Sequence, residues 1–287
     1  MAKERLDKLI ASTGRWSRRE VKTLVREGRV LVDGRIAGSA EEKYDAESCR
    51  IAVNGEEQLL RRHTYVMLHK PAGVLSATED GRGRTVLDLL TPELRKIGVF
   101  PVGRLDKDTE GLLLLTDDGE LAHALLSPKK HVDKVYYARV SGRLTPEDCA
   151  AFEAGMTLGD GLECLPAGLE ILAAGETSEC LVTLREGKFH QVKRMLAARG
   201  APVLYLKRLS MGPLVLDDAL HPGAFRELTA AETVHILAPL LADRQNAQRN
   251  LWEIEHLSQY PLRFPQKRKS FLWKKEKIAC KLCRSQV

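Results

Sequence analysis

Three carboxylates lie close together in one short stretch of the chain, at Asp106, Asp108 and Glu110. A pair of carboxylates is what a glycoside or nucleoside hydrolase uses, and a single carboxylate can act as a covalent nucleophile. Asp also closes turns by accepting hydrogen bonds from its own backbone. This stretch therefore predicts either a catalytic loop or an ordinary turn.

The residues after these carboxylates would hold the loop in place. Four consecutive leucines, at positions 112–115, lie between Gly111 and Gly119. Such a run is too short for a typical helix and predicts a strand that is buried on both faces. A buried strand is rigid, so residues 104–110 would be presented from a fixed edge, as a catalytic group requires.

The same stretch resembles the catalytic signature of RNA pseudouridine synthases, in the form found in the RsuA family of ribosomal RNA enzymes. The matching residues are Arg104-Leu105-Asp106, Asp108-Thr109 and the run Gly-Leu-Leu-Leu-Leu-Thr-Asp-Asp-Gly that starts at Gly111. The resemblance implies that Asp106 is the catalytic nucleophile. It extends over roughly residues 3–240.

Four further segments resemble motifs of this family. They are His69-Lys70-Pro71-Ala72-Gly73-Val74, Lys134-Val135-Tyr136, the segment from Glu186 to Leu196, and the segment from Lys207 to Leu214. The resemblance implies that Tyr136 contacts the target base and that Lys193 lies against the catalytic carboxylate. It also makes Arg104, Leu105, His190 and Gln191 candidate substrate-binding residues. An ordinary core tyrosine is the alternative for Tyr136, and Tyr137 should face the other side of the sheet because strand side chains alternate.

The N-terminal residues resemble the small alpha-L RNA-binding domain, also called the S-four type. Ser17 and Glu20 form a capping box for a helix with a stripe of apolar residues at Val21, Leu24 and Val25. The cations around this helix would contact RNA phosphates, or would only keep the surface solvated. These cations are Arg15, Arg18, Arg19, Lys22 and Arg26.

Charge and composition restrict the class of protein. The 287 residues are 44% hydrophobic and 29% charged, which is typical of a soluble globular chain. No apolar run suits a membrane span or a secretory signal, so we expect a cytoplasmic protein with its six cysteines reduced. Residues 3–37 carry 10 Lys/Arg against 5 Asp/Glu, and residues 241–287 carry 11 against 4. Basic charge at both ends indicates a polyanionic partner.

These observations predict an α+β fold with two domains and a tail. We expect an alpha-L RNA-binding domain at residues 1–53, a polar linker near residues 54–57, and a catalytic domain at residues 62–240. The catalytic domain should contain a mostly antiparallel mixed β-sheet flanked by helices. Residues 241–287 form a basic extension that is either disordered or binds single-stranded RNA, and its lone pair Cys280 and Cys283 is too little for a zinc site.

The predicted function is isomerisation of uridine to pseudouridine in ribosomal RNA, with small-subunit 16S rRNA as the expected target. The reaction rejoins the sugar to carbon 5 of the same base, so we expect no cofactor and no metal. Asp106 could attack either the sugar or the uracil ring, and Lys193 or Arg104 would keep it ionised. We expect a monomer that acts on ribosomal RNA or a pre-ribosomal particle, away from membranes.

Three alternatives remain open from the sequence. The first is the same reaction on large-subunit 23S rRNA. The second is a non-catalytic RNA-binding assembly factor, for which the set Asp106, Tyr136 and Lys193 would have no use. The third is a hydrolase that uses Asp106 with Asp108, and it would release free uracil.

Overall fold

The structure, a computed structural model, describes residues 3–46, 48–58, 60, 63–127 and 130–241. The predicted basic extension lies outside these ranges apart from Leu241, and so do Cys280 and Cys283. No helix in the described ranges is long and apolar enough to cross a membrane. The N-terminal part and the catalytic part each have a sheet and a hydrophobic core of their own. The domain boundaries given above stay predictions.

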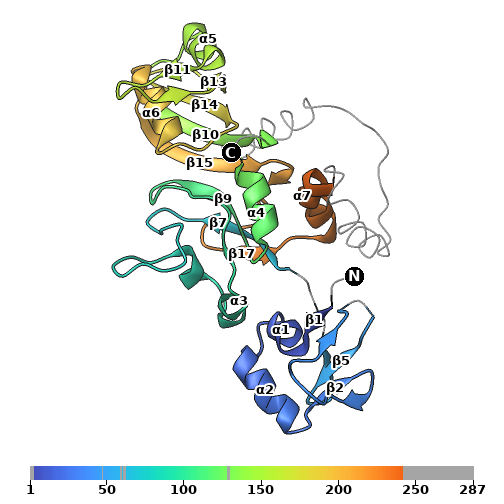
Figure 1. Cartoon of the computed structure of the whole chain (residues 1–287). Coiled ribbons are helices and arrows are strands. Elements are labelled where there is room, and N and C mark those ends of the chain that lie inside the picture. Colours follow the sequence, from blue (N-terminus) through green and yellow to red (C-terminus); the bar gives the residue numbers. More distant parts are fainter. Residues whose placement is uncertain (1–2, 47, 59, 61–62, 128–129, 242–287) are drawn as a thin grey trace. The chain divides into compact units, whose positions relative to one another are not determined.

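The N-terminal part combines two short helices with a four-stranded sheet of order β3-β2-β5-β6 and a separate pair of β1 with β4 (Figure 1). Its elements are β1 (Glu4–Arg5), α1 (Leu6–Ala11), α2 (Arg18–Arg26), β2 (Val30–Val32), β3 (Arg35–Ile36), β4 (Lys43–Tyr44), β5 (Ile51–Val53) and β6 (Glu56–Gln58). The predicted helix after Ser17 is confirmed as α2.

Helix α2 begins as the sequence predicts. The Ser17 hydroxyl accepts a hydrogen bond from the Glu20 amide, and the Glu20 carboxylate accepts one from the Ser17 amide. Together they satisfy two of the amide groups that a helix start leaves unpaired. Val21, Leu24 and Val25 are buried in the core of this part. The cationic face of the helix is exposed.

The predicted linker after residue 53 is wrong. Strand β6 pairs with β5 in an antiparallel hairpin, with Ala52 opposite Glu57. Asn54 and Gly55 form its two-residue turn and both have positive φ, 55° and 81°. An Asn-Gly pair is a strong signal for such a hairpin turn, and its polar composition is what suggested a linker.

The catalytic part contains a mixed nine-stranded sheet with the main order β13-β14-β10-β15-β9-β7-β17, while β16 pairs with β15 and β8 with β9. Its strands are β7 (Tyr65–Lys70), β8 (Phe100–Pro101), β9 (Glu110–Thr116), β10 (Lys134–Ser141), β13 (Gly168–Ala173), β14 (Thr177–Leu184), β15 (Val203–Met211), β16 (Leu214–Val215) and β17 (Phe225–Glu227). The small pair β11 (Met156–Thr157) and β12 (Glu163–Cys164) stands apart. The helices are α3 (Pro92–Ile97), α4 (Gly119–Leu126), α5 (Pro146–Ala154), α6 (Gln191–Ala198) and α7 (Ala230–Leu241), with a 3₁₀ turn at Val86–Leu89. The predicted α+β class with a mostly antiparallel sheet is confirmed.

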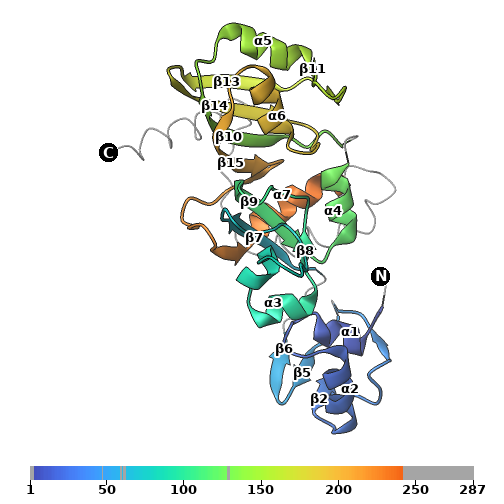
Figure 2. The same cartoon turned by 90° about the vertical axis from the view of Figure 1, so that its left-hand side faces the viewer.

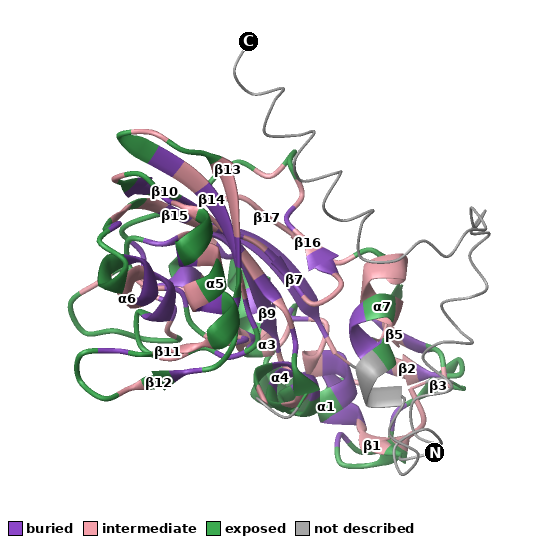
Figure 3. Ribbon diagram, turned by 90° about the horizontal axis from the view of Figure 1, so that it is seen from above, coloured by how far each residue is buried: buried purple, intermediate pink, exposed green. Residues whose placement is uncertain are grey.

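Helices cover both faces of this sheet. Side chains of α3, α5 and α6 belong to the core on one face, and side chains of α4 and α7 belong to the core on the other. Figure 2 shows α5 and α6 beside strands β13, β14 and β10, and Figure 3 shows the buried strands between the two helical layers. The four leucines of β9 are fully buried and alternate between the two cores. The prediction of a strand buried on both faces is confirmed.

The sheet consists of two halves that meet where β9 pairs with β15, and we call this pairing the seam. Among the named strands, β9 and β15 are the paired strands that run parallel. Their register places Lys207 opposite Glu110 and Arg208 opposite Gly111. Gly111 has φ +106°, and a Cβ atom there would lie 2.2 Å from the Arg208 main-chain oxygen. Only glycine allows the two backbones to approach this closely. The Arg208 Nε atom also donates to the Leu112 carbonyl across the seam, at 2.8 Å.

Replacing Gly111 with alanine should therefore separate the two halves of the sheet. Strain at a positive φ together with the clash should destabilise the protein by about 3 kcal/mol, measured as the change in the free energy of unfolding in urea. Gly119→Ala is the matched control, because Gly119 is exposed in the first turn of α4 and a Cβ atom there would meet nothing within 4 Å. Equal stability of the two variants would contradict the role given to the seam.

Candidate active site

The loop that carries Asp106 is held by its main chain. The Asp106 carbonyl accepts a hydrogen bond from the Thr109 amide at 3.1 Å, which closes the loop on itself. The Ser76 hydroxyl donates to the Leu105 carbonyl at 2.9 Å and accepts from the Leu105 amide at 3.1 Å. Leu105 is buried, whereas the Asp106 side chain keeps 26% of its surface exposed. The carboxylate is thus accessible on a loop that its neighbours fix.

Lys70 is a second anchor of this loop. Its side chain is fully buried, and its Nζ donates to the carbonyls of Pro71, Lys107 and Thr109 at 2.9, 3.2 and 2.9 Å. These contacts engage all three donors of the ammonium group. Burial lowers the pKa of Lys70 to about 8, although the negative charges of Asp108 and Asp106 act in the opposite direction. The charged form therefore fits the loop but is costly to bury.

Lys193 binds two carboxylates at once. Its Nζ lies 3.0 Å from Asp106 Oδ2 and 2.5 Å from Asp108 Oδ1. Burial lowers the pKa of Lys193, but the hydrogen bonds and charges of Asp108 and Asp106 outweigh it, so that this pKa is raised. The hydrogen bond from Lys193 in turn lowers the pKa of Asp108. The predicted contact of Lys193 with Asp106 is present, and its sharing with Asp108 is a feature that the sequence did not reveal.

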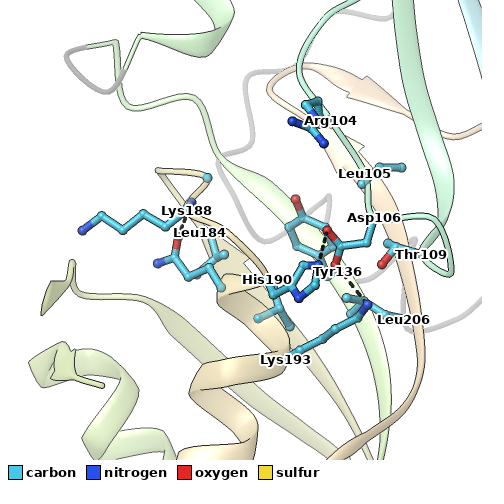
Figure 4. Close-up of a pocket in the computed structure, with 13 residues that line it drawn as sticks. Arg104, Leu105, Asp106, Thr109, Tyr136, Leu184, Lys188, His190, Lys193 and Leu206 are labelled. Carbon is cyan, nitrogen blue, oxygen red and sulfur yellow. Dashed lines mark hydrogen bonds and ion pairs between the residues drawn. The ribbon is translucent and has the colours of Figure 1, made fainter. Parts of the chain in front are cut away.

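A pocket opens over Asp106 (Figure 4). Loop residues, strand residues from β10, β14 and β15, and residues at the start of α6 enclose it. The lining residues are Arg104, Leu105, Asp106, Thr109, Tyr136, Leu184, Gly187, Lys188, His190, Gln191, Val192, Lys193 and Leu206. All seven residues that we predicted for the catalytic part are among them.

Tyr136 lies in this pocket and is almost fully buried by its neighbours, because only 8% of its surface is exposed. Tyr137 is on the opposite face of the sheet, where its ring meets Tyr205 edge-on with centroids 6.1 Å apart. The predicted alternation of the two tyrosines is confirmed. Tyr136 belongs to the core and lines the pocket at the same time, so the two interpretations of this residue are compatible.

The turn before α6 brings two polar side chains to the pocket. His190 Nε2 lies 3.5 Å from Asp106 Oδ1 (Figure 4). Gln191 is buried, and its side-chain amide donates to Glu186 Oε1 at 2.6 Å and accepts from the Lys188 amide at 3.0 Å. His190 can therefore contact a substrate beside Asp106, whereas Gln191 mainly shapes the turn.

Sequence reasoning missed the two groups that hold the catalytic loop, Lys70 and Ser76. Lys70 stands in a segment recognised as a family motif, but a lysine at the end of a strand gives no sign that its ammonium turns back to three carbonyls. Ser76 gives no local signal at all. Contacts between residues so far apart along the chain depend on the tertiary fold.

The N-terminal cations differ in what they contact. Asp7 is fully buried and accepts hydrogen bonds from Arg5 and from Arg18 Nη2, the latter at 3.1 Å to each oxygen. Lys22 and Arg5 bind Glu41, and Arg15 binds Glu56.

Two cations of helix α2 have no such partner. Within the described residues, Arg19 has no ion-pair partner, and the Arg26 guanidinium donates hydrogen bonds only to Lys22 O and Thr23 Oγ1 of its own helix. Arg19 and Arg26 therefore have charges that no carboxylate of the described residues neutralises.

No group of three or more His, Cys, Asp or Glu in the described ranges is placed to hold a metal ion.

Residues 64–198 match the family model for RNA pseudouridylate synthase, and residues 4–48 match that for the S4 domain. The chain is also 50% identical over 81% of its length to an uncharacterised RNA pseudouridine synthase of Bacillus subtilis, and it covers 98% of that protein. The chain belongs to the RNA pseudouridine synthase family. It is an enzyme of the type with an N-terminal S4 domain.

Other pseudouridine synthases are similar over nearly their whole length. The small-subunit synthase A of Vibrio cholerae is 39% identical over 81% of this chain and 99% of its own, and the large-subunit synthase B of B. subtilis is 40% identical over 84% and 97%. A crystal structure of a pseudouridylate synthase superposes with a TM-score of 0.57 at 34% identity, and the match covers 81% of this chain and 99% of that one. The family is therefore shown, and these identities do not separate the two ribosomal subunits.

The buried ammonium of Lys70 predicts how this pseudouridine synthase responds to alkaline pH. As pH rises through about 8, folded Lys70 loses its proton, and the neutral amine has too few donors for three carbonyls. We expect the single-turnover rate to fall by about tenfold per pH unit above that value. Folding stability should respond in the opposite direction, because the unfolded lysine still holds its proton and stability from this group rises with pH up to its ordinary pKa.

The variant Lys70→Met is the control for this pH profile. It should be slower at every pH, since the loop loses its three hydrogen bonds, and its rate should no longer fall between pH 7 and about 9. A rate profile of Lys70→Met that falls in parallel with the wild-type profile would assign the alkaline loss to another group.

Proposed function

We propose that this enzyme converts one uridine of ribosomal RNA into pseudouridine, and that its substrate is 16S rRNA or a pre-ribosomal particle containing it. The single observation that carries the chemistry is the Asp106 carboxylate, which is accessible in the pocket and lies 3.0 Å from the Lys193 ammonium. The similarity to small-subunit synthases supports the choice of substrate. Large-subunit 23S rRNA is the second candidate, and it is supported by a similarity to a large-subunit synthase that is about as high.

Four of the pocket residues have defined roles in the proposed reaction. The bond between N1 of uracil and C1′ of the ribose breaks and a bond between C5 and C1′ forms. C5 then loses its hydrogen as a proton, and N1 takes up a proton from water, so the product is an isomer of the substrate. Asp106 is the nucleophile, and the Lys193 ammonium lies beside its carboxylate as an ion-pair partner. Tyr136 packs against the base, while Leu105 forms an apolar wall beside it.

The target uridine must leave its stack to reach Asp106. Unstacking costs a few kcal/mol, which contacts inside the pocket must offset. Tyr136 and Leu105 supply apolar surface, and Arg104 and His190 supply polar groups at the side that remains exposed. A pocket of this kind suits one extruded nucleotide.

The geometry argues against a hydrolase that uses paired carboxylates. Such enzymes place their two carboxyl groups on opposite sides of the bond that is cleaved. Asp106 and Asp108 instead converge on the same Lys193 ammonium, and the Asp108 side chain is 75% exposed. They therefore do not enclose a substrate between them.

Mapping pseudouridines in the ribosomal RNA of a deletion strain tests the substrate. Loss of one site in 16S rRNA, restored by the wild-type gene, is the expected result. Loss of a site in 23S rRNA would select the second candidate. Unchanged 16S and 23S maps would refute the proposal for ribosomal RNA.

We also propose that the enzyme acts as a monomer in the cytoplasm.

Asp106→Asn should abolish turnover, because the amide has nearly the size of the carboxylate but is not a nucleophile. We expect a loss of at least about 10⁴-fold in the single-turnover rate, measured as tritium release from [5-³H]uridine-labelled rRNA, with RNA affinity retained. Asp108→Asn is the matched control that keeps Lys193 available to Asp106, and it should lose less than about tenfold. The reverse order of effects would exchange the two assignments.

We further propose that the N-terminal cations contact RNA phosphates. Arg19 and Arg26 are the best placed for this, because no carboxylate of the described residues neutralises them. Arg15, Arg18 and Lys22 can contribute as well, but each also has a structural partner. Phosphate contacts supply affinity without reading sequence.

Substitutions of two arginines on helix α2 should show separately the effects on RNA affinity and on the free energy of unfolding. Arg19→Ala should flatten the salt dependence of RNA binding by about one unit of log–log slope, at unchanged stability. Arg18→Ala should also cost about 1–2 kcal/mol of stability, because buried Asp7 loses one of its two cations. Binding isotherms at several salt concentrations and urea titrations measure both effects. An unchanged slope in both variants would remove this helix from the RNA contact.

A further inference from the structure

Two stacked aromatic rings stand at the edge of the pocket. The rings of Phe189 and His190 have centroids 3.8 Å apart and planes inclined by only 18°. Phe189 is 74% exposed. Among the large hydrophobic residues that are exposed in the described ranges, it is the one with an aromatic ring. A ring exposed in this way beside a binding pocket presents a face on which a nucleic-acid base can stack.

The turn that presents these rings is strained. The Gln191 amide donates to the Lys188 carbonyl at 3.2 Å, so Phe189 and His190 are the two central residues of a β-turn. His190 has φ +50° and ψ +32°, the left-handed region that glycine or asparagine would adopt at lower cost. Such a conformation persists when the surrounding contacts enforce it, and it is common at binding and active sites. The buried Gln191 and Glu186 hold the turn from below.

The stack extends from the catalytic carboxylate to solvent. Its inner ring belongs to His190, whose Nε2 lies 3.5 Å from Asp106 Oδ1 and which lines the pocket (Figure 4). Its outer ring belongs to Phe189, whose free face is open to solvent. The stacked pair therefore connects the lining of the pocket to an exposed aromatic ring.

We propose that Phe189, backed by His190, is a stacking platform for the base next to the target uridine. This inference rests on the proposed function, because it requires a uridine extruded from an RNA strand into the pocket. Extrusion leaves the neighbouring base with one uncovered face, and an aromatic ring replaces the lost stacking partner whatever the identity of that base. The platform thus selects unpaired RNA segments over duplex.

The competing explanation is that Phe189 only supports the His190 conformation. In that case its removal would disturb the site on every substrate, whether or not a neighbouring base is present. A platform loses its effect when the neighbouring base is absent. The two explanations can therefore be separated by changing the RNA together with the protein.

Short RNA hairpins that carry the mapped uridine provide the first experiment. In one hairpin both bases beside the uridine are intact, and in two others the 5′ or the 3′ neighbour is abasic. We expect Phe189→Ala to lower kcat/KM on the intact hairpin by about tenfold, which corresponds to about 1.4 kcal/mol, mainly through a higher KM. On one abasic hairpin the wild type should be equally impaired and Phe189→Ala should add nothing.

Three further variants sharpen this experiment. Phe189→Trp should retain full activity because it keeps an aromatic face, whereas Phe189→Leu should resemble Phe189→Ala. Leu204→Ala is the matched control, since Leu204 is an apolar side chain of β15 that is 59% exposed and does not line the pocket. Wild-type activity of Phe189→Ala on the intact hairpin, or an equal loss on all three hairpins, would overturn the platform.

A binding measurement tests the platform without turnover. A short single-stranded RNA carries 2-aminopurine beside a uridine, and its fluorescence falls when the 2-aminopurine stacks on a ring. Wild-type protein and Phe189→Trp should quench it, and Phe189→Ala should not. Quenching by Phe189→Ala equal to that of the wild type would refute the platform. Absence of tritium release by the wild type from every ribosomal RNA would instead refute the proposed function.

Discussion

The site depends on one close approach between two backbones, at Gly111 and Arg208. Asp106 belongs to the half of the sheet that contains β9, whereas Tyr136, His190 and Lys193 belong to the half that contains β10, β14 and β15. The two halves meet only at the seam within the sheet of the described residues. A larger residue than glycine there would push the halves apart, and the distance between Asp106 and Lys193 would change with them. The catalytic geometry is therefore set by a contact that no catalytic residue makes.

Two lysines near the carboxylates perform different tasks. Lys70 is buried and binds main-chain carbonyls, so it holds the loop in shape and does not touch either carboxylate directly. Lys193 binds the carboxylates Asp106 and Asp108 and holds no main chain of the described residues. If all the donors of the ammonium beside Asp106 were engaged by carbonyls, it would be a weak ion-pair partner for that carboxylate. A single lysine that both held the loop and paired with Asp106 could not move when the substrate enters. Separate lysines allow a rigid loop and an adjustable ion pair at the same site.

The sequence predicted those features that depend on neighbouring residues. The run of leucines in β9, the capping box at Ser17 and the alternation of Tyr136 with Tyr137 each follow from a local pattern. The Asn54-Gly55 hairpin was misjudged because polar composition was given more weight than turn chemistry. The contacts of Lys70, the sharing of Lys193 with Asp108, and the Phe189–His190 stack were not predictable. Each depends on segments that only the tertiary fold brings together, or on a backbone conformation that the residue type disfavours.

The distribution of charge implies a division of labour in RNA recognition. The phosphate contacts proposed for Arg19 and Arg26 would supply affinity, but they would be the same for every sequence. A pocket for one extruded uridine distinguishes uridine from other bases, and it does not distinguish one uridine of a long RNA from another. We expect discrimination among uridines to come from what adjoins the pocket, where the exposed side chains include Arg104, Phe189 and His190. A stacking platform that accepts any base would respond to whether the neighbouring nucleotide is unpaired, and not to its identity. Such an enzyme would therefore select its target by RNA structure more than by base sequence.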